Sequence, residues 1–166
     1  MRSLRVLVLC GLMITGAVAL AMAMGDAGFV QQTIIGTKAQ DFTLQTVSGQ
    51  KIDLSKHIQG KRAILLFWTT WCPHCRVAVK EINAMRDQIT SSNIAVILIS
   101  VGEPAQTISR YLQNNRYDFD VALDSDQSVS DAYRLMGVPT LVYIDEKGII
   151  SSVEYQFSSD FETIFK

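Results

Sequence analysis

The sequence has few of the residues on which several protein classes depend. Its three cysteines are Cys10, Cys72 and Cys75, and its two histidines are His57 and His74. These supply too few clustered ligands for a zinc or copper carrier, so we expect no metal site and no bound cofactor. The sequence also lacks an excess of either charge, with 15 Lys and Arg against 16 Asp and Glu. This balance gives no indication of a nucleic-acid partner.

The longest uncharged stretch lies at the N-terminus. Residues 6–24 carry no charge and follow Arg2 and Arg5. Small residues near the end of this stretch fit a signal peptide cleaved after Ala23, but a run of about 19 residues is also close to the roughly 20 that span a bilayer. Residues 1–24 are therefore predicted to be either a signal peptide or an uncleaved membrane anchor. Both alternatives export the following chain, because the arginines stay inside.

The most informative stretch is Trp71-Cys72-Pro73-His74-Cys75. The large apolar residues at 63–68 precede it and predict a buried strand. After it, apolar residues recur at steps of four, three and four, which predicts a helix; they are Ala78, Ile82, Met85 and Ile89. Pro73 suits the first helical position, since its missing N–H would have no partner there. The first turn of the helix therefore carries both thiols.

This placement predicts redox chemistry. The first turn of a helix has free N–H groups and the positive end of the helix dipole, so it favours a thiolate at Cys72, which we expect to be exposed and nucleophilic. Cys75 faces inward and is the expected resolving thiol. His74 can add positive charge or a hydrogen bond to the Cys72 sulfur. Trp71 is expected to lie at the rim of the site and shield that sulfur.

The other segments predict one domain over 39–166, after a linker over 25–38. The expected elements are a β-hairpin (41–54), a short helical turn capped by Ser55, a buried strand (94–99), a helix (104–114), a strand (117–123), a helix (127–135), a β-hairpin (141–155) and a helix ending at Phe165. This order predicts an α/β fold in which helices cover both faces of a mixed central sheet. In such sheets the site lies at the carboxyl ends of the strands, where Cys72 emerges.

Four motifs together resemble a known family. They are Phe67-Trp68-Thr69-Thr70-Trp71-Cys72-Pro73-His74-Cys75, Ala122-Leu123-Asp124-Ser125-Asp126, Gly137-Val138-Pro139-Thr140 and Asp41-Phe42-Thr43-Leu44. Over residues 36–166 the chain resembles the exported TlpA/ResA-like thiol–disulfide oxidoreductases of the thioredoxin superfamily. The resemblance implies a thioredoxin fold with an N-terminal β-hairpin extension. It also implies a cis Val138–Pro139 bond, which would leave the backbone of Val138 open to a substrate strand beside the disulfide.

The chain departs from the family at two acidic positions. Thioredoxins have a buried acid six residues before the first cysteine, where Leu66 stands, and the TlpA/ResA branch typically has a Glu three residues after the second cysteine, where Ala78 stands. Cys75 is thereby left without an obvious proton acceptor. Glu103, at the end of the 94–101 strand, is the candidate substitute. The alternative is that Glu103 is only a solvated residue that leads into the next helix.

The direction of electron flow is left open by the motifs. The Pro73-His74 pair between the cysteines is similar to that of the DsbA oxidants, whereas the whole domain is similar to reductants of the cytochrome-maturation kind. We favour a reductant in the periplasm or on the outer face of the inner membrane, with cysteine-containing envelope proteins and a membrane thiol donor or acceptor as partners. The alternatives are an oxidant or isomerase, and a tethered module that binds thiols or carries a metal without catalysis.

Overall fold

The computed structural model describes residues 34–165. The predicted signal peptide or anchor at 1–24 and most of the predicted linker lie outside these residues. Within them, no helix combines the length and apolar character needed to cross a membrane.

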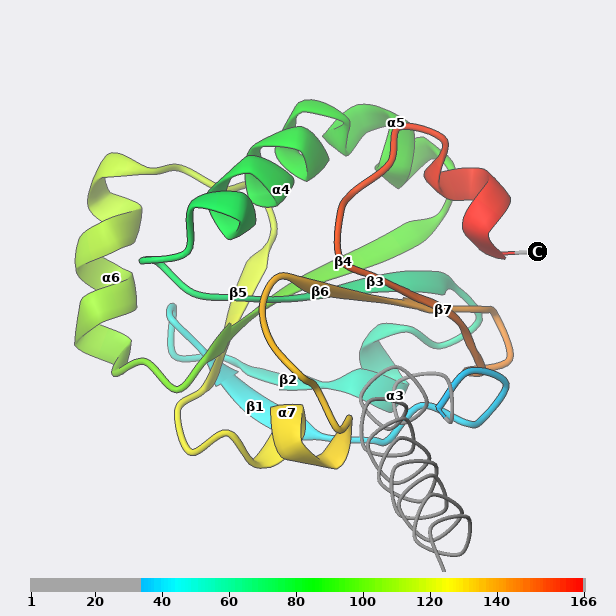
Figure 1. Cartoon of the computed structure of the whole chain (residues 1–166), viewed down its shortest axis with the longest axis horizontal. Helices are drawn as coiled ribbons and strands as arrows, with labels where there is room; N and C mark the ends of the chain where they lie inside the picture. The colour runs from blue at the N-terminus through cyan, green and yellow to red at the C-terminus, as the bar shows by residue number, and fades with distance from the viewer. Residues whose placement is uncertain (1–33, 166) are drawn as a thin grey trace, which may run out of the picture.

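A seven-stranded sheet with the strand order β2-β1-β5-β4-β3-β6-β7 forms the centre of the domain (Figure 1). The strands are β1 (Thr43–Thr46), β2 (Lys51–Asp53), β3 (Arg62–Trp68), β4 (Ile94–Val101), β5 (Asp120–Asp124), β6 (Thr140–Ile144) and β7 (Ile150–Glu154). The three central strands β5, β4 and β3 are parallel, and β6 and β7 continue the sheet antiparallel. The expected mixed sheet with an N-terminal hairpin is confirmed, because β1 pairs with β2 and also with β5.

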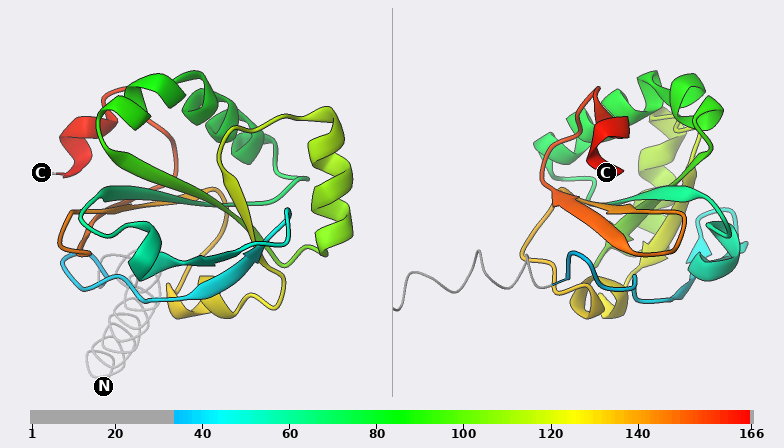
Figure 2. Two further views of the ribbon diagram at one scale, coloured as in Figure 1. Left: turned by 180° about the vertical axis from the view of Figure 1, so that it is seen from behind. Right: turned by 90° about the vertical axis from the view of Figure 1, so that its right-hand side faces the viewer.

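Helices cover both faces of this sheet (Figure 2). They are α3 (Leu54–His57), α4 (Pro73–Ala84), α5 (Arg86–Ser91), α6 (Ala105–Asn114), α7 (Ser128–Ala132) and the 3₁₀ helix η1 (Phe161–Phe165). The helices α4, α5 and α6 lie on one face with η1, and α3 and α7 lie on the other.

The apolar run of β3 is continuous because it faces two cores. Ile64, Leu66 and Trp68 pack beneath α4, whereas the alternate residues Leu65 and Phe67 pack toward α3 and α7. Successive side chains of a strand point to opposite faces, so a strand covered by helices on both sides is apolar at every position.

Several predicted element boundaries were wrong. The single helix predicted from Pro73 through Ile89 is interrupted at Met85, whose N–H is shared between the carbonyls of Glu81 and Ile82. Asp53, not Ser55, caps α3 by accepting a hydrogen bond from the N–H of Lys56. These errors do not move the cysteines.

Three more predictions need correction, two in the C-terminal half and one at the linker. The helix expected over 127–135 is shorter in the structure, where it comprises only α7. It ends early because Arg134 adopts a left-handed backbone with φ of 53°. The C-terminal helix is of the 3₁₀ type. Residues 36–38, expected in the linker, bond to the chain around β7: the N–H of Gly36 donates to Ile150, and Lys38 forms a bridge with Ile149.

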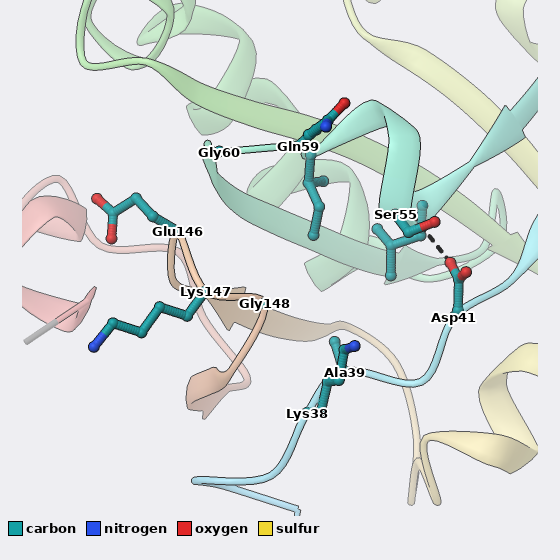
Figure 3. A pocket seen from close by; sticks show the side chains of 11 residues that line it. Lys38, Ala39, Asp41, Ser55, Gln59, Gly60, Glu146, Lys147 and Gly148 are labelled. Carbon is teal, nitrogen blue, oxygen red and sulfur yellow. Dashed lines mark hydrogen bonds between the residues drawn. The ribbon is translucent and has the colours of Figure 1, made fainter.

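A pocket of about 250 Å³ lies between the N-terminal segment, α3 and the β6–β7 turn (Figure 3). Asp41 accepts a hydrogen bond from the N–H of Ser55 at its edge, and Glu146 and Lys147 line the opposite side. Gly60 lies in its wall and comes just before β3, whereas Cys72 comes just after β3. The pocket is therefore at the opposite end of this strand from the cysteines.

Candidate active site

Cys72 lies between the carboxyl end of β3 and the first turn of α4. It is the N-cap residue of α4, with an extended backbone at φ −82° and ψ 113°, and Pro73 occupies the first helical position. Because β3 runs parallel to β4, the cysteine emerges at the edge of the sheet where the loop after β4 also lies. The predicted position of Cys72 at the start of a helix is confirmed.

Cys72 and Cys75 form a disulfide, with their Cα atoms 5.2 Å apart. The backbone N–H of Cys75 donates a hydrogen bond to the Sγ atom of Cys72, with an N···S distance of 3.1 Å. This N–H belongs to the third helical position and has no carbonyl partner within the helix. After reduction, the same N–H and the helix dipole are placed to stabilise negative charge on the Cys72 sulfur.

The two cysteines are both buried, but unequally. Cys72 is 5% exposed and Cys75 is completely buried. The expectation that Cys72 is exposed was therefore wrong in degree, because the Val138 loop packs against the sulfur: the Val138 carbonyl oxygen lies 3.8 Å from the Sγ atom. The order of accessibility is as predicted, so a thiol from another molecule reaches Cys72 more easily.

Two side chains beside the disulfide, Trp71 and His74, are exposed. Trp71 is 70% exposed and lies beside Thr69, Met136 and Val138 in the wall of a hollow of about 290 Å³. His74 is exposed at the first turn of α4. In this disulfide form, none of the hydrogen bonds of residues 34–165 joins His74 to either sulfur.

The Val138–Pro139 peptide bond is cis, as the resemblance implied. A hydrogen bond within the segment 137–140 stabilises it, since the hydroxyl of Thr140 donates to the carbonyl oxygen of Gly137 at 2.7 Å. Pro139 lines a second hollow, of about 400 Å³, together with His74. Residues about 65 positions apart in the sequence are thus brought together around one disulfide.

Glu103 is buried, and its carboxylate binds the loop that leads to Cys72. Its side chain accepts two hydrogen bonds from Thr70, one from the N–H at 2.7 Å and one from the hydroxyl at 2.6 Å. The residue is only 7% exposed, so the alternative of a solvated residue is wrong. The observed contacts connect Glu103 to Thr70 rather than to Cys75.

Sequence reasoning missed three apolar residues near the site. Val77 is 53% exposed, Met136 is 60% exposed and Tyr155 is 50% exposed. Val77 and Tyr155 line the hollow that contains Pro139, and Met136 lines the hollow that contains Trp71. Val77 could have been found from the sequence, because it is an apolar residue outside the spacing that begins at Ala78 and predicts the buried face of the helix. No pattern in the sequence places Met136 or Tyr155 near the disulfide.

The family model of the AhpC/TSA family matches residues 35–153. The chain belongs to the AhpC/TSA family. Within residues 34–165 no three His, Cys, Asp or Glu side chains lie together as a metal site would require.

Relatives of this AhpC/TSA-family chain are thiol–disulfide oxidoreductases. It is 30% identical over 154 residues to the thiol-disulfide oxidoreductase ResA of Bacillus subtilis, covering 90% of this chain and 84% of the relative. It is 29% identical to ResA of Halalkalibacterium halodurans, covering 71% of this chain and 66% of that relative. A thiol:disulfide interchange protein of Chlorobium tepidum has a similar structure, with a TM-score of 0.69, 26% identity, and coverage of 78% of this chain and 94% of its own. The predicted thioredoxin fold and the resemblance to ResA are confirmed, and the chain is a redox enzyme of this class.

Proposed function

We propose that this AhpC/TSA-family chain is an exported oxidoreductase that reduces disulfides in cysteine-containing proteins of the bacterial cell envelope. The observation that carries the proposal is the sulfur of Cys72 at the N-cap of α4, hydrogen-bonded by the N–H of Cys75 and next to the carbonyl of Val138. The ResA relatives support the reaction class. The uncharged N-terminal residues after Arg2 and Arg5 support export.

The reaction proceeds in two exchanges. The Cys72 thiolate of the reduced enzyme attacks a client disulfide, forms a mixed disulfide and releases one client thiolate. Cys75 then loses its proton and attacks the Cys72 sulfur, which releases the second client thiolate and leaves the Cys72–Cys75 disulfide. The client gains two electrons from the enzyme and one proton from Cys75, and its other thiolate takes a proton from solvent. Because the compartment is oxidising, a membrane thiol donor must reduce the enzyme again.

The proton of Cys75 needs an acceptor in the second exchange. Cys75 is completely buried, and the two acids of related enzymes are replaced by Leu66 and Ala78. Glu103 is the nearest candidate suggested by the sequence, but the structure shows both of its oxygens accepting hydrogen bonds from Thr70. We propose that the client thiolate leaving Cys72 takes up this proton, and that Glu103 serves the site by holding the loop.

The second candidate function is a thiol oxidant. The Pro73-His74 pair favours it, because exposed His74 can add positive charge beside the thiolate, and a more stable thiolate makes the disulfide a stronger oxidant. The resemblance over the whole domain favours the reductant.

The reduction potential of the Cys72–Cys75 couple separates the two candidates. It is measured on the full chain by equilibration with glutathione or dithiothreitol redox buffers. A value near or below about −250 mV supports the reductant, since thioredoxin lies near −270 mV, and a value near −120 mV, as in DsbA, supports the oxidant. Catalytic turnover in an insulin-reduction assay distinguishes either enzyme from a module that only traps clients. An alkaline phosphatase fused after residue 38 tests export, because that reporter is active only outside the cytosol.

A further inference from the structure

An open groove begins at His74 and Pro139, which flank the disulfide, and follows one side of α4. Its first part has a volume of about 400 Å³ and contains His74, Val77 and Pro139. Its second part, of about 670 Å³, contains Met85 and Ser159. The two parts share Glu81, Gln156 and Phe157, so they form one continuous surface depression.

The groove has the dimensions of an extended peptide. Its helical wall is the stripe of α4 that repeats every three or four residues from His74, together with Met85 at the end of this helix. This stripe rises about 16 Å at about 1.5 Å per residue, which equals about five residues of extended chain. The opposite wall is formed by Pro139, by Glu154 at the end of β7 and by residues 155–159 after it. The chain after β7 leaves the sheet and rises to the layer of α4 and α5 (Figures 1 and 2).

The groove presents both apolar and acidic side chains. Val77, 53% exposed, and Tyr155, 50% exposed, line its first part. Exposed Glu81 lines both parts, and half-buried Glu154, which accepts a hydrogen bond from the hydroxyl of Ser152, lines the second part. No Lys or Arg among residues 34–165 lines either part or forms an ion pair with these two carboxylates.

We propose that this groove binds an extended client segment that has an apolar residue beside its reactive cysteine and a Lys or Arg about three to five residues away. The inference rests on the proposed function and adds a preference for cationic clients. Glu81 is seven residues after His74, about 10 Å along the helix, which three extended residues span. Charge complementarity at such a distance selects among clients and speeds their docking, and it weakens with added salt.

The test uses reduced full-length protein and disulfide-linked peptide dimers. Each peptide has one Cys beside a Leu, and the residues four positions before and after the Cys are both Lys, both Gln or both Glu. Hydroxyethyl disulfide, which is uncharged and too small to span the groove, is the reference substrate. The initial rate of enzyme oxidation is measured at 20 mM and at 500 mM NaCl.

The Lys peptide should react roughly three-fold to ten-fold faster than the Gln peptide at low salt, since two charge pairs near the surface, one with exposed Glu81 and one with half-buried Glu154, contribute about this much together. The Glu peptide should be slower than both, and high salt should bring the three rates together. The double variant Glu81→Gln/Glu154→Gln should lose the preference without any change toward hydroxyethyl disulfide.

The control double variant is Glu146→Gln/Glu162→Gln, which makes the same change in net charge at exposed positions outside the groove. It should retain the preference. Loss of the preference in this control to the same extent would assign the effect to the overall charge and overturn the proposal. Equal rates for the three peptides, with normal reduction of hydroxyethyl disulfide, would also overturn it and leave the proposed function standing. Failure to reduce any disulfide would overturn both.

Discussion

Glu103 holds Thr70 through both of its carboxylate oxygens, two residues before the redox-active cysteine. This pair of hydrogen bonds, the Glu103–Thr70 clamp, joins the loop after β4 to the loop after β3. A further hydrogen bond connects Glu103 to the loop after β5, because the hydroxyl of Ser125 donates to the Glu103 backbone carbonyl at 2.9 Å. The position of Cys72 therefore depends on three loops that follow three neighbouring parallel strands.

Removing the Glu103 carboxylate should destabilise the protein. Glu103→Ala leaves the N–H and the hydroxyl of Thr70 without their acceptor, and hydrogen bonds to a charged group contribute about 1.5 to 3 kcal/mol each. We expect a loss of roughly 2 to 4 kcal/mol in the free energy of unfolding, measured by urea titration of the oxidised protein. Thr70→Val should lose about half as much, because the N–H bond remains. A change below about 0.5 kcal/mol in Glu103→Ala would show that the clamp has no structural role.

The proton-acceptor hypothesis for Glu103 gives a different result. Glu103→Gln keeps the shape of the side chain but cannot accept a proton at neutral pH. If Glu103 takes the proton of Cys75, this variant should accumulate mixed disulfide during turnover and lose the pH dependence of its resolution. If Glu103 only holds Thr70, as we propose, the resolution step should keep its pH profile. Quenched-flow trapping of the mixed disulfide across pH 5 to 9 separates the two outcomes.

The two cysteines should behave differently when substituted. Cys75→Ser should accumulate mixed disulfides with client proteins, because the attacking sulfur of Cys72 remains and the resolving sulfur is gone. Cys72→Ser should accumulate few, since Cys75 is completely buried. The measurement is the yield of high-mass adducts on non-reducing gels after alkylation. Stronger trapping by Cys72→Ser would reverse the assignment of the nucleophile.

His74 should raise the reduction potential of the couple. Its side chain is exposed in the first turn of α4, where a positive charge favours the thiolate and so the reduced form. His74→Ala should make the disulfide harder to reduce, by roughly 30 mV for each tenfold loss of thiolate stability. His57→Ala, on α3 at the opposite face of the sheet, is the control and should leave the potential unchanged. Equal potentials in wild type and His74→Ala would exclude this role.

Tyr143 should be dispensable for stability at neutral pH. Its hydroxyl is buried without a hydrogen-bond partner in the structure, and burial together with the charge of Glu154 raises its pKa above the ordinary 10.0. Tyr143→Phe removes an unpaired polar group and should stabilise the protein by up to about 1 kcal/mol. Tyr133→Phe should instead cost about 1 kcal/mol, because the Tyr133 hydroxyl donates to the carbonyl of Gln40 at 2.8 Å. Thermal unfolding of both variants at pH 7 makes the comparison.

The same raised pKa predicts a loss of stability in alkali. Above pH 10 the unfolded chain releases the tyrosine proton, whereas the buried side chain of Tyr143 keeps it. The unfolded state therefore gains stability as the pH rises past the ordinary tyrosine value. Tyr143→Phe should lose less unfolding free energy than wild type between pH 9 and pH 11, in urea titrations at each pH. An identical decline would show that this side chain does not contribute.

The sequence alone determined the local features of the redox centre. The apolar run before the threonines, Pro73 after Cys72 and the helical spacing that begins at Ala78 are short-range patterns, and each one depends only on backbone geometry and burial. They predicted a buried strand, a helix start and two thiols in its first turn. The structure confirms the strand and the helix start, with Cys75 in the first turn and Cys72 directly before it at the N-cap. The order of the strands and helices along the chain predicted the mixed sheet, because the rules for connecting neighbouring strands allow only a few topologies.

The tertiary structure alone decided how the rest of the chain meets those thiols. From the sequence, the side chain of Glu103 was compatible with a buried or a solvated environment, and only the approach of the loop after β4 to Thr70 selected the buried one. Met136 and Tyr155 are far from Cys72 in the sequence, and the folding of the chain brings them to its rim. Exposure, partners and grooves are set by contacts between distant segments, and residue patterns within one segment carry no information about which distant segment will pack against it.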